Sequence, residues 1–81
     1  MIEIKIYTKD YCPFCHRAKM LLDSLNLKYE EVEIKSGEKM SQLVEKTGMM
    51  TVPQIFINEK LIGGCDDLFS QIDEIKKTYN L

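Results

Sequence analysis

The spacing of apolar residues changes abruptly near the start of the chain, and this change constrains the fold more than any other feature. Ile2, Ile4 and Ile6 alternate with other residues, a period of two that predicts a strand with one buried face. From residue 14 the apolar residues recur every three or four positions, which predicts an amphipathic helix. Asn26 is placed to close that helix. The helical stripe consists of Phe14, Ala18, Leu21, Leu22 and Leu25.

A second strand and a second helix follow. Residues 29–34 are prone to form a strand but carry three glutamates, so we expect a weak strand at the edge of a sheet. Ser36 and Gly37 interrupt the chain. A short helix is predicted after them, with inward-facing residues and with Gly48 at its C-terminal end. The inward-facing residues are Met40, Leu43 and Val44.

The last third of the chain predicts a hairpin and a closing helix. Residues 54–57 form a short apolar run after Pro53, and Asn58-Glu59 can turn it into a second strand over 60–62. Gly63 and Gly64 end the hairpin. The final helix carries Asp66 and Asp67 at its start and Lys76 and Lys77 near its end, as the helix dipole favours. Its apolar stripe consists of Leu68, Ile72, Ile75 and Tyr79.

The predicted order is therefore β-α-β-α-β-β-α, an α/β fold. Its first half is a βαβ unit, which requires parallel strands and a right-handed crossover. We expect residues 1–81 to form one domain, because a chain of 81 residues is short for two.

Composition excludes several classes of partner. The net charge of −2 gives no basic surface for nucleic acid or an anionic membrane. No apolar run approaches the roughly 18 residues of a membrane span, and the first residues do not resemble a signal peptide. We therefore expect a cytoplasmic protein. Its three cysteines are an odd number for a structural disulfide framework and point to reactive thiols, metal ligands or buried bystanders.

The motif that carries chemistry is Cys12-Pro13-Phe14-Cys15, at the junction of the first strand and helix. Only a thiolate attacks disulfides efficiently, and a helix N-terminus stabilises negative charge at Cys12. Pro13 suits the first helical turn because its missing N–H costs nothing there. Cys15 lies three residues on, over the same face and beside the apolar stripe. The motif predicts an exposed nucleophile, Cys12, and a sheltered resolving thiol, Cys15.

Two other interpretations of this motif remain open. Two cysteines at this spacing form half of a zinc site, but only Cys65 and His16 are left as further soft ligands, so we expect no metal site. A purely structural disulfide is the other alternative, and the absence of an export signal argues against it.

Three segments together resemble the glutaredoxin branch of the thioredoxin-like fold. Residues 7–15 resemble its strand end and active site, Thr51-Val52-Pro53 its Thr-Val-Pro signature, and residues 62–67 its Gly-Gly-x-Asp region. The resemblance covers nearly the whole chain. It implies a four-stranded mixed sheet flanked by three helices and a cis peptide before Pro53, although on chemistry alone this proline could be trans.

The resemblance also implies a groove for glutathione as co-substrate, with no tightly bound cofactor. Backbone groups of Val52 would pair with its cysteinyl unit, and N–H groups of Cys65 and Asp66 would hold its γ-glutamyl carboxylate. Lys9 would pair with the glycyl carboxylate, and Asp66 or Asp67 with the ammonium. The implied glutathione-binding residues are Lys9, Phe14, Thr51, Val52, Pro53, Gly64, Cys65, Asp66 and Asp67.

Simpler roles remain open for several of these residues. Asp66 and Asp67 can serve as caps of the last helix, Lys9 as a solvated surface charge, and Cys65 as a bystander. The sequence also departs from the family. Phe14 stands where many relatives have tyrosine, and Met49 and Met50 stand near a position often held by an arginine or another polar residue. These methionines can form an adaptable apolar rim for protein substrates.

The expected function is glutathione-dependent reduction of protein–glutathione mixed disulfides and protein disulfides by a monomer. The partners are glutathione and glutathionylated or disulfide-containing proteins. One alternative is a thioredoxin-like reductase fed by a flavoprotein, but the chain lacks the Trp-Cys-Gly-Pro-Cys pattern. Another is an iron–sulfur carrier, in which two chains share one cluster. In the family that role goes mostly with Cys-Gly-Phe-Ser sites.

Overall fold

The first strand, β1 (Ile4–Thr8), alternates buried and partly buried side chains, as the isoleucine spacing predicts. The computed structural model describes residues 2–81, so Met1, the first residue of the expected domain, lies outside the described residues. Ile2 is partly buried and precedes the strand. The period of two therefore places Ile4 and Ile6 on one face of the sheet and Tyr7 on the other.

The sheet has four strands in the order β2-β1-β3-β4. β2 (Glu30–Glu33) pairs in parallel with β1, while β3 (Gln54–Ile57) pairs with β1 in the antiparallel sense. β4 (Lys60–Gly63) completes a hairpin with β3. The mixed sheet is confirmed, and the glutamate-rich strand lies at its edge as expected.

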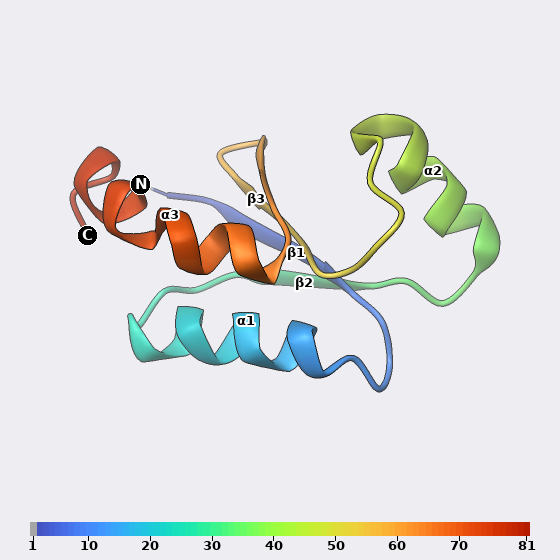
Figure 1. Ribbon diagram of the computed structural model, residues 1–81, viewed down its shortest axis with the longest axis horizontal. Helices are drawn as coiled ribbons and strands as arrows, with labels where there is room; N and C mark the ends of the chain where they lie inside the picture. The colour runs from blue at the N-terminus through green and yellow to red at the C-terminus, as the bar shows by residue number, and fades with distance from the viewer. Residues whose placement is uncertain (1) are drawn as a thin grey trace.

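Three helices cover the sheet. α1 (Pro13–Ser24) and α3 (Cys65–Thr78) lie side by side on one face, and α2 (Gly37–Thr47) lies on the other, as Figure 1 shows. The predicted helix ends are confirmed. Asn26 has φ of 57° just after α1, and Gly48 caps α2 with φ of 76°, a left-handed conformation that suits glycine.

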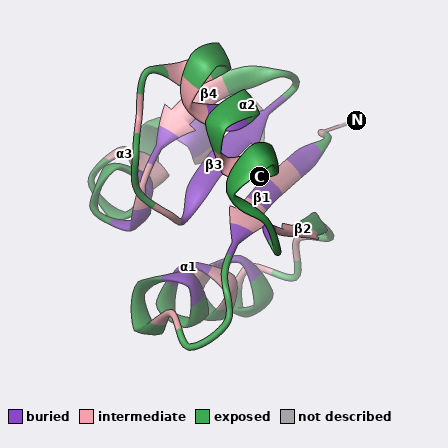
Figure 2. Ribbon diagram, turned by 90° about the vertical axis from the view of Figure 1, so that its right-hand side faces the viewer, coloured by how far each residue is buried: buried purple, intermediate pink, exposed green. Residues whose placement is uncertain are grey.

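The apolar core divides between the two faces of the sheet, with buried residues along the strands and on the helix surfaces that face them (Figure 2). The larger cluster lies between the sheet and the α1–α3 layer. It contains Ile4, Ile6, Ala18, Leu22, Ile55, Ile57, Cys65, Leu68 and Ile75. The smaller cluster, Ile34, Leu43 and Phe56, lies under α2. All four residues of β3 are buried, and its apolar residues contribute to both clusters, Ile55 and Ile57 to the larger and Phe56 to the smaller.

Strand register determines which loops meet. Tyr7 pairs with Gln54, so the C-terminal end of β1 lies beside the start of β3. Ile55, near the start of β3, pairs with Gly63, the last residue of β4. The end of β4 and the start of α3 therefore lie at the same end of the sheet. The loops before α1, β3 and α3 therefore converge at one end of the molecule.

We expect Leu68→Ala to lower the free energy of unfolding by about 2–5 kcal/mol, because it leaves a cavity at a fully buried position of α3. Urea denaturation followed by circular dichroism measures this change. Leu81→Ala is the matched control, because 46% of the Leu81 surface is exposed, and it should change stability by no more than about 0.5 kcal/mol. Equal effects of the two substitutions would contradict the described core.

Candidate active site

The two cysteines of the Cys-Pro-Phe-Cys motif lie at the N-terminus of α1. Cys12 is the N-cap residue, with extended backbone angles, and Pro13 is the first helical residue. The preceding residue, Tyr11, has φ of 56° and a fully exposed side chain. Cys12 and Cys15 form a disulfide with a Cα–Cα distance of 5.2 Å. The predicted helical spacing therefore does bring the second sulfur to the first.

The helix N-terminus gives the two sulfurs different surroundings. The backbone N–H of Cys15 donates to the Sγ of Cys12 at 3.1 Å, as a side-chain cap does. No acidic residue lies in the first turn of α1 to oppose negative charge. Cys12 is half-buried, whereas only 2% of the Cys15 surface is exposed. On reduction, the helix N-terminus favours a thiolate at the more accessible sulfur.

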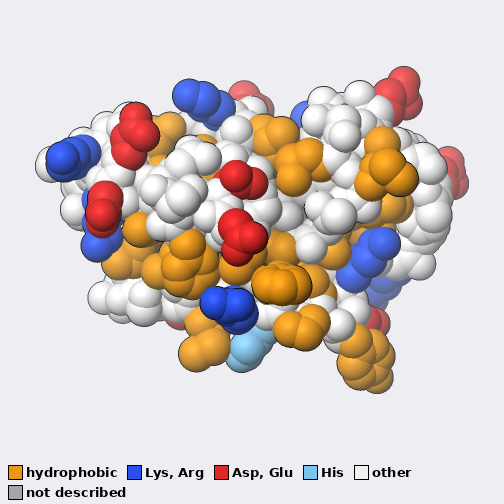
Figure 3. Space-filling view, in the orientation of Figure 1, with side chains coloured by type: hydrophobic (Ala, Val, Ile, Leu, Met, Phe, Trp, Pro, Cys, Tyr) orange, Lys and Arg blue, Asp and Glu red, His pale blue; other side chains and the backbone are white. Residues whose placement is uncertain are grey.

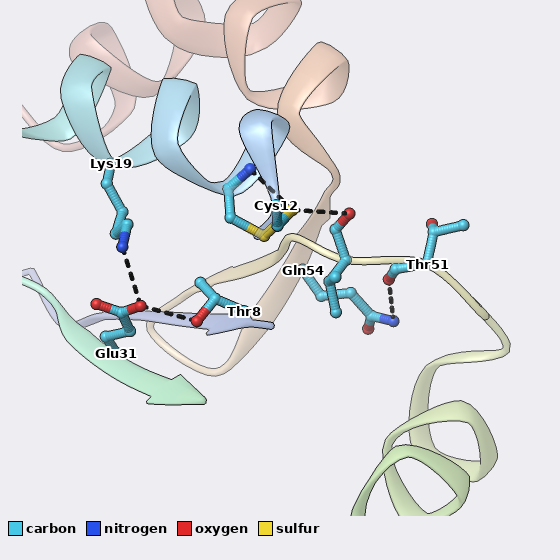
Figure 4. Close-up of a disulfide and its surroundings, with 8 residues drawn as sticks. Thr8, Cys12, Lys19, Glu31, Thr51 and Gln54 are labelled. Carbon is cyan, nitrogen blue, oxygen red and sulfur yellow. Dashed lines mark hydrogen bonds and ion pairs between the residues drawn. A yellow bond between two sulfur atoms is a disulfide. The ribbon is translucent and has the colours of Figure 1, made fainter. Parts of the chain in front are cut away.

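The loop before β3 lies against the other side of Cys12. The Sγ of Cys12 is 3.9 Å from the carbonyl oxygen of Val52. Figure 4 shows Cys12 between the Thr8–Glu31 pair and this loop. The peptide between Val52 and Pro53 is cis, as the resemblance implied. Thr51 is exposed, Val52 half-buried and Pro53 buried. The backbone of this segment thus borders the reactive sulfur.

The sequence interpretation missed Gln54, which is fully buried at the start of β3. Its Nε2 donates to the carbonyl oxygens of Met49 and Thr51, at 3.0 Å each, as Figure 4 shows for Thr51. Its Oε1 is buried and has no partner among the described residues. Gln54 therefore positions the loop that borders Cys12. A polar side chain inside an otherwise apolar strand was the signal that could have revealed this role.

The start of α3 lies beside the same loop. A Cβ atom placed on Gly64 would be 3.5 Å from the carbonyl oxygen of Pro53. Gly63 has φ of 126°, a conformation that favours glycine, and a Cβ there would collide with the Asp67 side chain. The two glycines thus allow α3 to begin close to Cys12.

The two aspartates at the start of α3 differ in their contacts. The Oδ2 of Asp67 accepts from the backbone N–H of Gly64 at 2.9 Å, so Asp67 caps the helix. Asp66 is exposed, and its side chain takes part in none of the hydrogen bonds of the described residues. The structure thus confirms a capping role for Asp67 and leaves the Asp66 carboxylate free for a ligand.

Cys65 is the free cysteine of the described residues and is buried at the start of α3. Burial raises the pKa of its thiol, and the Arg17 guanidinium offsets this only in part. A thiol with a raised pKa forms less thiolate near neutral pH and reacts more slowly. The surroundings of Cys65 therefore make it less reactive than an ordinary exposed thiol.

The remaining predicted binding residues surround the disulfide with exposed side chains. Lys9 follows β1 and lines a groove of about 740 Å³ together with Cys12. It also lines a second groove, of about 700 Å³, toward α2 and the exposed Met50. Phe14 is 52% exposed on α1. The fold thus brings Lys9, Phe14 and the segments 51–53 and 64–67 to one end of the molecule.

Acidic side chains gather in the groove beside Cys12, at the edge strand β2. Glu31 accepts from Thr8 Oγ1 at 2.8 Å and pairs with Lys19 Nζ at 3.0 Å. The Thr8 hydrogen bond, more than the Lys19 contact, holds the pKa of Glu31 below its ordinary value. Contact with Asp10 raises the pKa of Glu33. This side of Cys12 therefore carries the carboxylates of Asp10, Glu31 and Glu33 together with the cations Lys9 and Lys19.

Neither metal-binding clusters nor long apolar helices are found in residues 2–81. No three His, Cys, Asp or Glu side chains in this range are grouped so that they could hold a metal ion. None of the helices in this range is both long and apolar enough to cross a membrane.

We expect alkylation of the reduced protein to modify Cys12 first, because the helix N-terminus stabilises its thiolate. Cys65 should react more slowly than Cys12, because burial raises the pKa of its thiol. Mass spectrometry of iodoacetamide-treated samples between about pH 4 and pH 9, a range that brackets ordinary and lowered thiol pKa values, measures the order. Faster reaction at Cys15 or Cys65 near neutral pH would contradict this assignment. Cys12→Ser is the matched control and should remove the early phase alone.

Comparison with known proteins gives one consistent family. The family model described as Glutaredoxin matches residues 4–62. The chain is 46% identical over 71 residues to glutaredoxin 3 of Escherichia coli K12, covering 86% of each chain. It is 49% identical over 70 residues to glutaredoxin 1 of Rickettsia prowazekii, covering 83% of this chain and 74% of the relative.

Solved structures agree with this family in fold. Glutaredoxin 1 of Francisella tularensis, complexed with cacodylate, superposes with a TM-score of 0.86 at 30% identity, covering 95% of this chain and 99% of that one. A buckwheat glutaredoxin–glutathione complex gives a TM-score of 0.80 at 35% identity, covering 90% of this chain and 70% of that one. With its Cys12–Cys15 pair at the start of α1, this chain belongs to the glutaredoxin family of thiol–disulfide oxidoreductases.

Proposed function

We propose that this protein reduces protein–glutathione mixed disulfides and protein disulfides with glutathione as co-substrate. The observation that carries the proposal is the position of Cys12. Its Sγ accepts an N–H at the start of α1 and lies 3.9 Å from the Val52 backbone. A thiolate, a backbone segment for pairing and a second helix N-terminus are thus grouped at one end of the sheet.

The proposed cycle has two branches. The Cys12 thiolate attacks the glutathione sulfur of a mixed disulfide, the protein thiolate leaves and takes a proton, and a second glutathione then releases oxidised glutathione. In the other branch Cys12 attacks a protein disulfide and Cys15 displaces the substrate, which closes the Cys12–Cys15 bond. Two glutathione molecules reopen this bond and leave as oxidised glutathione.

The groove for glutathione follows the residues around Cys12. The cysteinyl unit lies along Val52, between Thr51 and Pro53, and the γ-glutamyl carboxylate meets the N–H groups of Cys65 and Asp66 at the start of α3. The ammonium pairs with Asp66, because Asp67 already caps Gly64. Lys9 pairs with the glycyl carboxylate, and Phe14 and Gly64 line the groove. The buckwheat glutaredoxin, which has the same fold and was solved in complex with glutathione, supports this choice of ligand.

Residues 1–81 act as one domain and as a monomer, because the cycle needs only groups at one end of one chain. Reopening the Cys12–Cys15 bond requires a reduced glutathione pool, which the cytosol provides.

Two coupled assays test the function directly. The mixed disulfide of glutathione and 2-mercaptoethanol should be reduced when the protein is coupled to glutathione and glutathione reductase. The same protein coupled to thioredoxin reductase should give little turnover with insulin as the disulfide. The reverse pattern would contradict glutathione dependence and favour the flavoprotein-fed reductase. A brown colour after anaerobic purification would instead favour the iron–sulfur carrier.

We expect Cys15→Ser to keep most of the activity on the small mixed disulfide, because that branch needs Cys12 alone. The same substitution should abolish reduction of protein disulfides that need a resolving thiol. Initial rates in the glutathione-coupled assay measure both activities. Cys65→Ser is the control that removes a thiol outside the cycle. Equal losses of the two activities in Cys15→Ser would reject the two-branch cycle.

We expect Asp66→Asn and Asp67→Asn to have separable effects. Asp67→Asn weakens the cap on Gly64 and should lower the free energy of unfolding by about 0.5–2 kcal/mol. Asp66→Asn should cost only its interaction with the helix dipole, about 0.3–1 kcal/mol, and should raise the apparent KM for glutathione severalfold, because it removes the partner of the ammonium. Thermal unfolding and glutathione-coupled kinetics of both variants measure the two effects. A larger rise in KM for Asp67→Asn, after correction for unfolded protein, would assign the ammonium to Asp67.

A further inference from the structure

Exposed apolar side chains gather around one basic residue where α1 and α3 lie side by side. Phe14 and Met20 on α1 are 52% and 57% exposed, and Phe69 on α3 is 44% exposed. Arg17 lies between them, and we call these four residues the Arg17 patch. Figure 3 shows a continuous hydrophobic area over the two helices, interrupted by a basic side chain. Contiguous exposed apolar surface of this kind is typical of an interaction site.

Two aromatic rings orient the guanidinium of Arg17. Its Cζ lies 5.9 Å from the ring centroid of Phe14 and 5.9 Å from that of Phe69. These distances are within the range of cation–π contacts. Arg17 has no ion pair among residues 2–81, where Lys19–Glu31 is the salt bridge. The only arginine of the chain is therefore held by rings, exposed to solvent, and free to bind a carboxylate in the fork geometry that guanidinium offers.

The patch is continuous with the reactive site. Phe14 belongs to the Cys12–Cys15 motif and carries one of the two rings against Arg17. Arg17 lowers the pKa of the Cys65 thiol and Asp66 raises it, so both charges act on the start of α3. In the proposed groove the glutathione ammonium pairs with Asp66, which leaves the Arg17 charge without a counterpart. A protein joined to the glutathione sulfur is held beside Cys12, and Phe14, two residues on, connects that point to the patch.

We propose that the Arg17 patch docks the protein half of the substrate and favours an apolar residue beside an acidic one next to the reacting cysteine. The inference rests on the proposed function and names the substrate class of the same site. The apolar side chain covers Phe69 and Met20, and the carboxylate pairs with Arg17. In the reaction Cys12 bonds to the glutathione sulfur, the bond between that sulfur and the substrate sulfur breaks, and the substrate leaves as a thiolate that takes a proton from water.

Matched peptides test this specificity. Two synthetic peptides, each carrying one cysteine as its mixed disulfide with glutathione, differ only in a Leu-Glu or Leu-Lys pair beside that cysteine. The unmodified enzyme should reduce the Leu-Glu peptide with a kcat/KM roughly two- to fivefold higher, the range given by an exposed ion pair. The difference should shrink as salt is added, because exposed charges are screened.

Variants of the patch separate the contribution of the Arg17 charge from that of apolar contact. Arg17→Gln should abolish the preference for Leu-Glu while leaving reduction of the small 2-mercaptoethanol mixed disulfide unchanged. Lys76→Gln is the matched control, because it removes the same charge near the other end of α3 and should keep the preference. Phe69→Ser should lower kcat/KM for both peptides, because it removes apolar contact from each.

Distinct outcomes would overturn the docking inference or the underlying function. Equal rates for the two peptides with the unmodified enzyme would overturn docking at the Arg17 patch. A preference for Leu-Lys would overturn it as well and assign the protein half to the acidic groove lined by Asp10, Glu31 and Glu33. Failure to reduce even the small mixed disulfide would reject the proposed function.

Discussion

The antiparallel pairing of β1 with β3 is the constraint on which the active site depends. In its register Tyr7 pairs with Gln54, so the chain leaves β1 and enters β3 at the same end of the sheet. The hairpin then returns Gly63 to Ile55, and α3 starts there too. A slip of one residue would turn Ile55 and Ile57 out of the larger cluster, so burial of the core fixes the register. Core packing thereby places Val52 against Cys12.

Local sequence signals were sufficient for most of the fold. The period of two in β1 and the helical stripe of α1 both arise because one face of the element is buried. Such a pattern can be recognised within the sequence of the element alone. The same holds for the position of Cys12, because Pro13 marks the first turn of the helix. The glutamates of β2 indicated an edge strand, since carboxylates are tolerated where no further strand pairs. The resemblance to glutaredoxins supplied the mixed sheet, which periodicity alone does not give.

What the sequence did not predict depends on contacts between distant segments or on a choice between neighbours. Gln54 occupies an apolar run, and nothing local shows that its amide holds the carbonyls of Met49 and Thr51. Asp66 and Asp67 are chemically identical and adjacent, and only the folded backbone selects Asp67 as the cap of Gly64. The cation–π contact of Arg17 with Phe69 requires two helices that are far apart in sequence, α1 and α3. In all three cases the role of the side chain depends on tertiary contacts that no local sequence pattern indicates.

The charges near the reactive sulfur are arranged asymmetrically, and this bears on how a disulfide enters. On the β2 side of Cys12, Asp10, Glu31 and Glu33 share a groove with Lys9 and Lys19, and the hydrogen bond from Thr8 keeps Glu31 ionised to lower pH by holding its pKa down. On the other side, the start of α3 offers backbone N–H groups near Val52 together with the carboxylates of Asp66 and Asp67, of which Asp67 already caps Gly64. In the proposed complex the γ-glutamyl end of glutathione lies at the start of α3, while its glycyl carboxylate reaches Lys9 in the groove beside β2. In the proposed docking the protein half is joined to the sulfur beside Cys12, and Phe14, two residues along the chain, connects that point to Arg17, so one helix would supply both the nucleophile and the surface that meets the protein.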